Sequence, residues 1–144
     1  EDLRSKDVTY SFDIDGSFVG GPSAGAAMTV ATIAAIEDTQ VDNQTAVTGT
    51  ITREGRIGRV GGILEKAETA GERGLDSFYV PEGQASITYY ERQVVKEEVA
   101  PGLVTETVEY VPREFSVNRY TERRYNMSTE EVSDIEELSE EMIE

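Results

Sequence analysis

The sequence contains no histidine, no cysteine and no tryptophan, and lysine occurs at only three of its 144 positions. The absence of cysteine excludes disulfides, thiol nucleophiles and thiolate metal sites. The absence of histidine excludes every catalytic triad and every metal site that depends on an imidazole. No apolar run is long enough for a transmembrane helix, and no signal peptide is recognisable. The chain opens on a charged stretch without an initiator methionine, which indicates a fragment.

Basic residues are scarce relative to acidic ones. There are 29 acidic and 13 basic residues, and the formal net charge is −16. Binding to phosphate groups depends on clustered lysine and arginine, so this balance argues against a nucleic-acid partner and against anionic membrane surfaces. The length predicts a single domain over residues 1–144.

The first half of the chain alternates between strand and helix patterns, which predicts a layered α/β or α+β fold. Residues 24–36 are apolar nearly all round, so we expect a helix buried in the centre of the domain. Pro22 is suited to the first turn of that helix, and Gly74 to the end of the second one. The expected strands cover 9–14, 45–52, 57–60 and 75–80, and the expected helices cover 24–36 and 63–73.

The second half contains two extended runs, 87–95 and 103–111, around Pro101-Gly102. This pattern predicts a projecting hairpin arm. Its tyrosines, Tyr89, Tyr90 and Tyr110, could bind peptide or a neighbouring subunit, or simply pack across the strands. Residues 114–124 fit a helix or a loop, and 125–127 fit a last short strand. Ser128 followed by Glu131 is typical of a capping box, which predicts a C-terminal helix with an apolar stripe of Val132, Ile135, Leu138 and Met142.

Without histidine, a serine nucleophile needs another base to take its proton, which can be a lysine or an acidic residue acting through water. A lysine serves when burial or a neighbouring charge lowers its pKa toward neutrality. Lys66 shares a helix face with Ile63 and Ala70, whereas Lys6 and Lys96 lie among charged neighbours and are expected in solvent. The alternative for Lys66 is a side chain that extends past the apolar face into water.

Ser23 lies within the segment Gly-Gly-Pro-Ser-Ala-Gly at residues 20–25. Glycines beside a serine at a helix start allow a sharp turn and close approach of a substrate carbonyl. Free N–H groups at such a helix start can stabilise an oxyanion. A serine in this position can equally be a simple helix cap.

Three ordered motifs resemble those of one peptidase family. Residues 21–28, Gly-Pro-Ser-Ala-Gly-Ala-Ala-Met, resemble the nucleophile motif of Lon-type (S16) serine peptidases. Thr48-Gly49-Thr50-Ile51 resembles their Thr-Gly-Glu-Ile strand, with Thr50 in place of the glutamate. Residues 55–66 resemble their hairpin and lysine helix, and the serine-to-lysine separation of 66 − 23 = 43 residues agrees. The segments around Ser23 and 80–84 are similar to archaeal Lon-like peptidases that lack the ATP-driven module.

The resemblance implies an α+β Lon proteolytic domain fold, related to ribosomal protein S5 domain 2, with some N-terminal strands missing here. It implies a serine endopeptidase with a Ser–Lys dyad. Ser23 would attack the peptide carbonyl, Lys66 would act as general base, and Thr48 would orient the lysine amine. Backbone N–H groups of Ser23 and Gly21 would hold the oxyanion.

The resemblance also implies a polypeptide substrate, no cofactor, no metal and a homo-oligomer, commonly a ring of six. No phosphate-binding loop is recognisable, so we expect ATP-independent cleavage. The compartment stays open between cytoplasmic and membrane-associated or exported. Two alternatives remain: a catalytically silent Lon-like scaffold, and an acyl-transferring or self-cleaving Ser–Lys protein. Asp13, Asp15 and Gly16 suggest a turn, a cation site or a carboxylate that holds Lys66.

Overall fold

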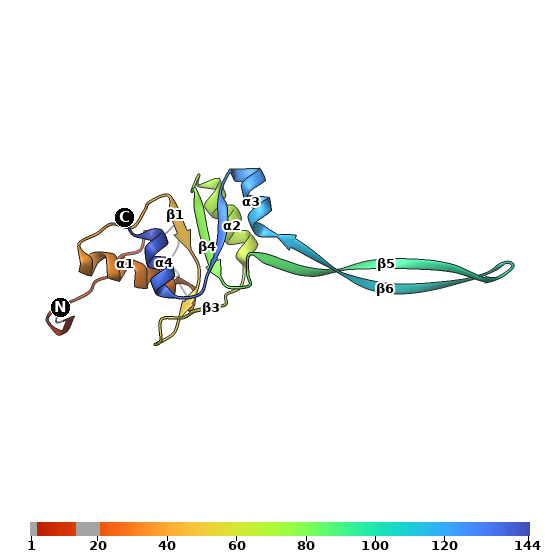
Figure 1. The fold of residues 1–144 in the computed structure, drawn as a ribbon, viewed down its shortest axis with the longest axis horizontal. Helices are drawn as coiled ribbons and strands as arrows, with labels where there is room; N and C mark the ends of the chain where they lie inside the picture. The colour runs from red at the N-terminus through yellow and green to blue at the C-terminus, as the bar shows by residue number, and fades with distance from the viewer. Residues whose placement is uncertain (1–2, 14–20) are drawn as a thin grey trace.

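The computed structural model describes residues 3–13 and 21–144, and its ribbon is drawn in Figure 1. Two single-turn 3-10 helices, η1 and η2, cover Leu3–Ser5 and Pro22–Ala24. The remaining elements in chain order are α1 Gly25–Glu37, β1 Thr45–Val47, β2 Thr50–Ile51, β3 Ile57–Gly58, α2 Ile63–Glu72, β4 Ser77–Pro81, β5 Ser86–Ala100, β6 Leu103–Ser116, α3 Val117–Tyr125, β7 Ser128–Val132 and α4 Ile135–Met142.

A parallel sheet with strand order β1-β4-β7 forms the middle layer of the body. Helices α1 and α4 pack together on one side of it, and α2 and α3 pack together on the other (Figure 1). Successive side chains of a strand point to opposite faces of its sheet. Because helices cover both faces, strand β4 is buried on both sides. Its Tyr79 joins the core on the α1 and α4 side, while Phe78 and Val80 join the core on the α2 and α3 side. The expected mixture of helices and strands in layers is confirmed.

The hairpin arm predicted between residues 87 and 111 is present and longer than expected. Strands β5 and β6 pair antiparallel from Ser86–Ser116 outward to the turn at Pro101-Gly102, with an irregularity between Glu98 and Ala100. The arm extends far from the body of the molecule (Figure 1). Nearly all of its side chains are exposed, because no other described strand pairs with either of its edges.

Helix α1 differs from the expectation of a fully buried central helix. Only Ala26, Val30 and Ala34 are buried, and they follow one face at a spacing of four residues. Ala31 and Ala35 on other faces are exposed. The prediction was wrong because α1 lies in an outer layer, against α4 and β2, rather than between two layers. Alanine tolerates either environment, so the apolar composition does not distinguish them.

The expected strand 45–52 is divided in two. Its first part, β1, pairs with β4, whereas its second part, β2, pairs with β3 across a turn at residues 53–56. The break falls at Thr48 and Gly49, where the chain leaves the parallel sheet for the small hairpin. The predicted strand 9–14 is wrong over 9–13, where no strand forms and Tyr10 Oη lies 2.7 Å from Thr32 Oγ1 of α1. Ile14 and the glycine-containing segment 16–20 lie outside the described residues.

The C-terminal expectations are wrong in two places. Residues 125–127 are not a strand, and Ser128 begins strand β7 rather than a helix. Ser128 pairs with Ser77 of β4, so sheet pairing prevails over the local capping pattern. Helix α4 begins after Asp134, whose side chain accepts a hydrogen bond from the Glu137 N–H at 3.0 Å. The ambiguous segment 114–124 divides into the end of β6 and most of α3.

The close packing of α2 on α3 gives a first prediction. A methyl group added at Gly71 would collide with the Tyr125 ring, whereas one added at Gly61 would meet no other atom within 4 Å. We expect Gly71→Ala to lower the free energy of unfolding by about 1 to 3 kcal/mol through overpacking. Chemical denaturation checks this, with Gly61→Ala as the matched control. Equal stability of the two variants would contradict the described packing.

Candidate active site

Ser23 lies in the single 3-10 turn η2, directly before α1. Gly21 precedes this turn with φ 101°, a left-handed conformation that favours glycine. Pro22 then supplies a helical φ without needing a hydrogen-bond acceptor for its nitrogen. The first hydrogen bond of the turn is donated by the Gly25 N–H to the Pro22 carbonyl. The sequence therefore presents Ser23 at the amino-terminal end of a helix.

Thr48 and Gly49 fix the start of α1 to the sheet. The Gly49 N–H donates to the Ser23 carbonyl at 2.9 Å, and the Gly49 carbonyl accepts from the Ala26 N–H at 3.0 Å. The Thr48 N–H donates to the Tyr79 carbonyl of β4 at 3.0 Å. The backbone of Ser23 is consequently held one residue away from Thr48.

Lys66 comes to the same place from α2. Its Nζ donates to Thr48 Oγ1 at 3.2 Å, and Thr48 is only 5% exposed. Ile63 and Ala67 of the same helix are buried, while Lys66 itself is partly buried. Thus Lys66 is directed back along its helix toward the sheet instead of extending freely into water.

Ser23 and Lys66 are therefore attached to two adjacent residues, one through its backbone carbonyl and the other through its amine. The Ser23 hydroxyl itself makes no hydrogen bond within the part of the chain that the structure describes. A hydroxyl of a partly buried serine at a helix start remains available for chemistry in this arrangement. The structure therefore joins Lys66 to Thr48 through side chains and Ser23 to the adjacent Gly49 through the backbone, and among the described residues the Ser23 hydroxyl and the Lys66 amine form no hydrogen bond with each other.

A hollow of about 450 Å³ lies beside the lysine helix. Gly62 lines it, and a methyl group added at Gly62 would lie 4.0 Å from the Lys66 Cε. Gln84 and Val60 also line it, and the Gln84 side-chain amide accepts from the Val60 N–H at 2.9 Å and donates to the Val60 carbonyl at 2.7 Å. None of Ser23, Thr48 and Lys66 is among the residues that line this hollow.

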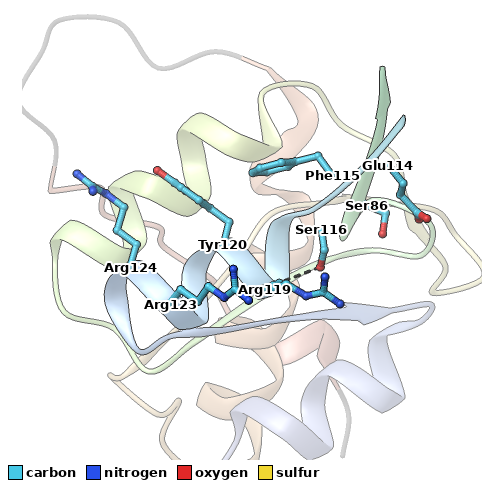
Figure 2. Close-up of a pocket in the computed structure, with 8 residues that line it drawn as sticks. All are labelled: Ser86, Glu114, Phe115, Ser116, Arg119, Tyr120, Arg123 and Arg124. Carbon is cyan, nitrogen blue, oxygen red and sulfur yellow. Dashed lines mark hydrogen bonds between the residues drawn. The ribbon is translucent and has the colours of Figure 1, made fainter. Parts of the chain in front are cut away.

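A second hollow, of about 900 Å³, lies between α3 and the root of the arm and contains none of these three residues (Figure 2). We call it the arginine hollow, and its lining residues are Ser86, Glu114, Phe115, Ser116, Arg119, Tyr120, Arg123 and Arg124. The sequence did not predict this hollow, because residues 114–124 fitted a helix or a loop equally well. A basic cluster, Arg119, Arg123 and Arg124, was the available signal.

The pKa values of Tyr79, Tyr120 and Arg124 are raised by their surroundings. The hydrogen bond that Tyr120 donates to Glu68 at 2.7 Å raises the pKa of Tyr120 to about 12, because the protonated phenol is the donor. Burial raises the pKa of Tyr79, with the nearby Glu141 carboxylate as a further cause. The hydrogen bond and attraction to Tyr125 raise the pKa of Arg124.

Metal ligands and membrane helices are not found in the described ranges 3–13 and 21–144. No group of three acidic side chains gathers there in a way that could hold a metal ion. Asp13 is exposed, and its expected partners Asp15 and Gly16 lie outside the described residues. Among the helices of those same ranges, none combines the length and hydropathy that crossing a bilayer requires.

Comparison with known proteins gives one consistent family. The family model of the Lon protease (S16) C-terminal proteolytic domain matches residues 15–113. The chain is 37% identical over 113 residues to an archaeal Lon protease from Thermoplasma acidophilum, which covers 74% of this chain and 17% of that protein. It is 40% identical over 81 residues to a Lon protease from Clostridium acetobutylicum, covering 56% of this chain and 10% of that protein.

The chain therefore belongs to the family of the Lon protease C-terminal proteolytic domain. The resemblance recognised in the sequence is confirmed, including the similarity to archaeal Lon proteases, of which one from Thermoplasma volcanium is 37% identical over 86 residues. Family membership supports a serine protease function. The matched stretch spans at most about a sixth of these relatives, as the 17% coverage of the first one shows.

The Lys66–Thr48 hydrogen bond gives a second prediction. We expect Thr48→Val to lower the free energy of unfolding by about 1 to 2 kcal/mol, because the hydroxyl that accepts from the Lys66 amine is lost. Repeating the substitution in a Lys66→Met background isolates this bond, since the methionine has no amine to leave unpaired. Denaturation of the four chains measures the coupling. Equal costs of Thr48→Val in both backgrounds would show that the bond contributes nothing.

Proposed function

We propose that this chain is a serine endopeptidase in which Ser23 is the nucleophile and Lys66 is the general base. The observation that carries the proposal is the hydrogen bond from Lys66 Nζ to Thr48 Oγ1, one residue from the amide that binds the Ser23 carbonyl. Two groups suited to nucleophilic catalysis are thereby held by one short segment. Without histidine in the chain, lysine is the side chain available to serve the serine as a base.

In this mechanism the Lys66 amine removes the hydroxyl proton as Ser23 Oγ attacks the peptide carbonyl. The resulting oxyanion is stabilised by the backbone N–H groups of Ser23 and Gly21. Lys66 then returns the proton to the leaving amine, and an acyl ester forms on Ser23. A water molecule, activated by the same amine, hydrolyses the ester and releases the second product. Thr48 is a positioning residue, because its hydroxyl restricts the rotamers of Lys66.

Peptide-bond hydrolysis by this mechanism consumes only water, so the chemical steps need no nucleotide. We therefore propose ATP-independent cleavage of polypeptides that reach the site in an extended form. A catalytically silent scaffold is the competing function, but it would not require both the serine and the lysine to be retained.

Substitution of the two residues tests the mechanism. We expect Ser23→Ala and Lys66→Met each to reduce cleavage of unfolded casein by roughly a thousandfold or more, because either change removes the activated nucleophile. Ser11→Ala and Lys96→Met are matched controls at exposed positions and should retain activity. Addition of ATP and magnesium should leave the rate unchanged. Equal cleavage by the wild-type chain and Ser23→Ala would overturn the proposal.

Covalent labelling separates the peptidase from the scaffold. A peptidyl phosphonate should add one mass equivalent to the wild-type chain, located on Ser23 by peptide mapping, and none to Ser23→Ala. The label should also be lost in Lys66→Met, because the serine is then no longer activated. Absence of labelling in the folded wild-type chain would favour the silent scaffold.

A further inference from the structure

Arginines without acidic partners line the arginine hollow. The chain has more than two acidic residues for each basic one, with 29 against 13. Even so, Arg119, Arg123 and Arg124 form no ion pair with any carboxylate in the described residues. Arg119 and Arg123 are four residues apart on α3 and therefore share a face of that helix. Figure 2 shows both guanidinium groups on the same side, with Arg124 directed away beyond Tyr120.

The distal part of the arm carries the opposite charge. Residues 93–109 contain four glutamates and one lysine, and the lysine, Lys96, is paired with Glu106 at 3.4 Å. Glu97 and Glu109 form no ion pair within the described part of the chain. Their cross-strand partners, Thr105 and Gln93, place them on one face of the hairpin. One face of the distal arm is therefore an acidic surface in solvent.

These two surfaces of one molecule cannot meet. Ser86 lines the arginine hollow, and Glu97 lies 97 − 86 = 11 residues further along β5. At about 3.3 Å per residue, a strand of that length places Glu97 roughly 35 Å from the hollow, and Glu109, opposite Gln93, lies 93 − 86 = 7 residues or roughly 23 Å out. Glutamate and arginine side chains do not bridge such a separation. An acidic arm that fits the hollow must therefore come from another molecule.

The exposure of the arm favours a partner along its length. A two-stranded hairpin is marginally stable in water by itself. The distal arm also exposes apolar side chains, with Val99 at 55%, Leu103 at 57% and Val104 at 54%. Phe115 and Tyr120 provide apolar surface within the arginine hollow. The distal arm and the arginine hollow thus both expose apolar surface, and their charges are opposite.

We propose that the acidic distal part of the arm of one copy binds in the arginine hollow of a second copy of this chain. The contact is heterologous, because different surfaces of the two copies meet, and repetition of it produces a closed ring or an open chain. The contact involves neither Ser23 nor Lys66, so it is independent of the proposed peptidase function. Its failure and that of the peptidase would appear in separate experiments.

Charge reversal on the arm tests the contact. Glu97→Lys with Glu109→Lys changes the net charge from −16 to −12, because each substitution adds two positive charges. The less negative net charge weakens the repulsion between copies. If net charge alone governed association, the variant would therefore associate more strongly than the wild type. We expect instead that the association constant falls by about tenfold or more, because lysines then face arginines. Sedimentation velocity measures the constant, and circular dichroism verifies that the variants are folded.

The matched control carries the same charge change elsewhere. Glu136→Lys with Glu140→Lys on exposed positions of α4 should leave association unchanged or strengthen it. Adding Arg119→Glu and Arg123→Glu to the arm variant restores complementary charges at the original net charge, and association should return. The proposal is overturned if the wild-type chain is monomeric at its highest soluble concentration. It is also overturned if the arm variant associates as well as the wild type, as it would if the hollow bound an acidic peptide instead.

Cysteine cross-linking locates the contact directly, because the natural chain contains no cysteine. We expect a mixture of Thr105→Cys and Ser86→Cys chains to form a disulfide-linked dimer containing one of each under mild oxidation. Thr105 lies opposite Glu97 on the arm, and Ser86 lines the hollow. Glu140→Cys replaces Ser86→Cys in the control mixture. Equal rates of mixed-dimer formation in the two mixtures would overturn the proposed contact.

Discussion

The organisation of this molecule depends on the hydrogen bonds made by Thr48 and Gly49. These two residues bind β4 through the Tyr79 carbonyl, the start of α1 through Ser23 and Ala26, and α2 through the Lys66 amine. Each bond contributes on the order of 1 kcal/mol net, so their joint value is a few kcal/mol. Their larger effect is geometric, because they require three separate elements to converge on one point of the chain.

This convergence explains why small residues surround the segment. A methyl group on Gly49 would collide with the Ile57 side chain, and one on Gly25 would lie 3.1 Å from the Ile51 Cγ2. The two glycines therefore allow α1 to approach the β2–β3 hairpin closely. The alanine-rich sequence of α1 has the same role along the helix, since Ala26 is completely buried against this junction. A bulkier sequence would move Ser23 away from the residues that hold Lys66.

Much of this arrangement could be predicted from the sequence, and the failures share a physical cause. The start of α1, the end of α2 and the arm follow from local signals, which are Pro22, Gly74 and Pro101-Gly102 respectively. Ser128 was assigned to a helix because its capping pattern is local, whereas its pairing with Ser77 joins residues 51 positions apart. The partial exposure of α1 depends likewise on which layer covers it.

The site and the arginine hollow differ in predictability for a related reason. Ser23, Thr48 and Lys66 were found because their motifs resemble a family, while their spacing alone would have left Ser23 as a helix cap. The hollow has no motif, and it exists only because α3 and the root of the arm meet.

The strong acidity of the chain is compatible with the proposed association between its copies, because the repulsion of the net charges and the attraction of groups in contact act over different distances. At physiological ionic strength the Debye length is about 8 Å, so exposed charges farther apart than this are largely screened. Most of the net charge of −16 on one copy is therefore not felt by the body of the next. Groups in direct contact, such as the glutamates and arginines of the proposed interface, are screened far less. An arm that keeps two acidic bodies roughly 35 Å apart while its tip meets arginines reduces the repulsion and retains the attraction. In the proposed contact, the length of the arm is the feature that lets so acidic a chain associate with a second copy of itself.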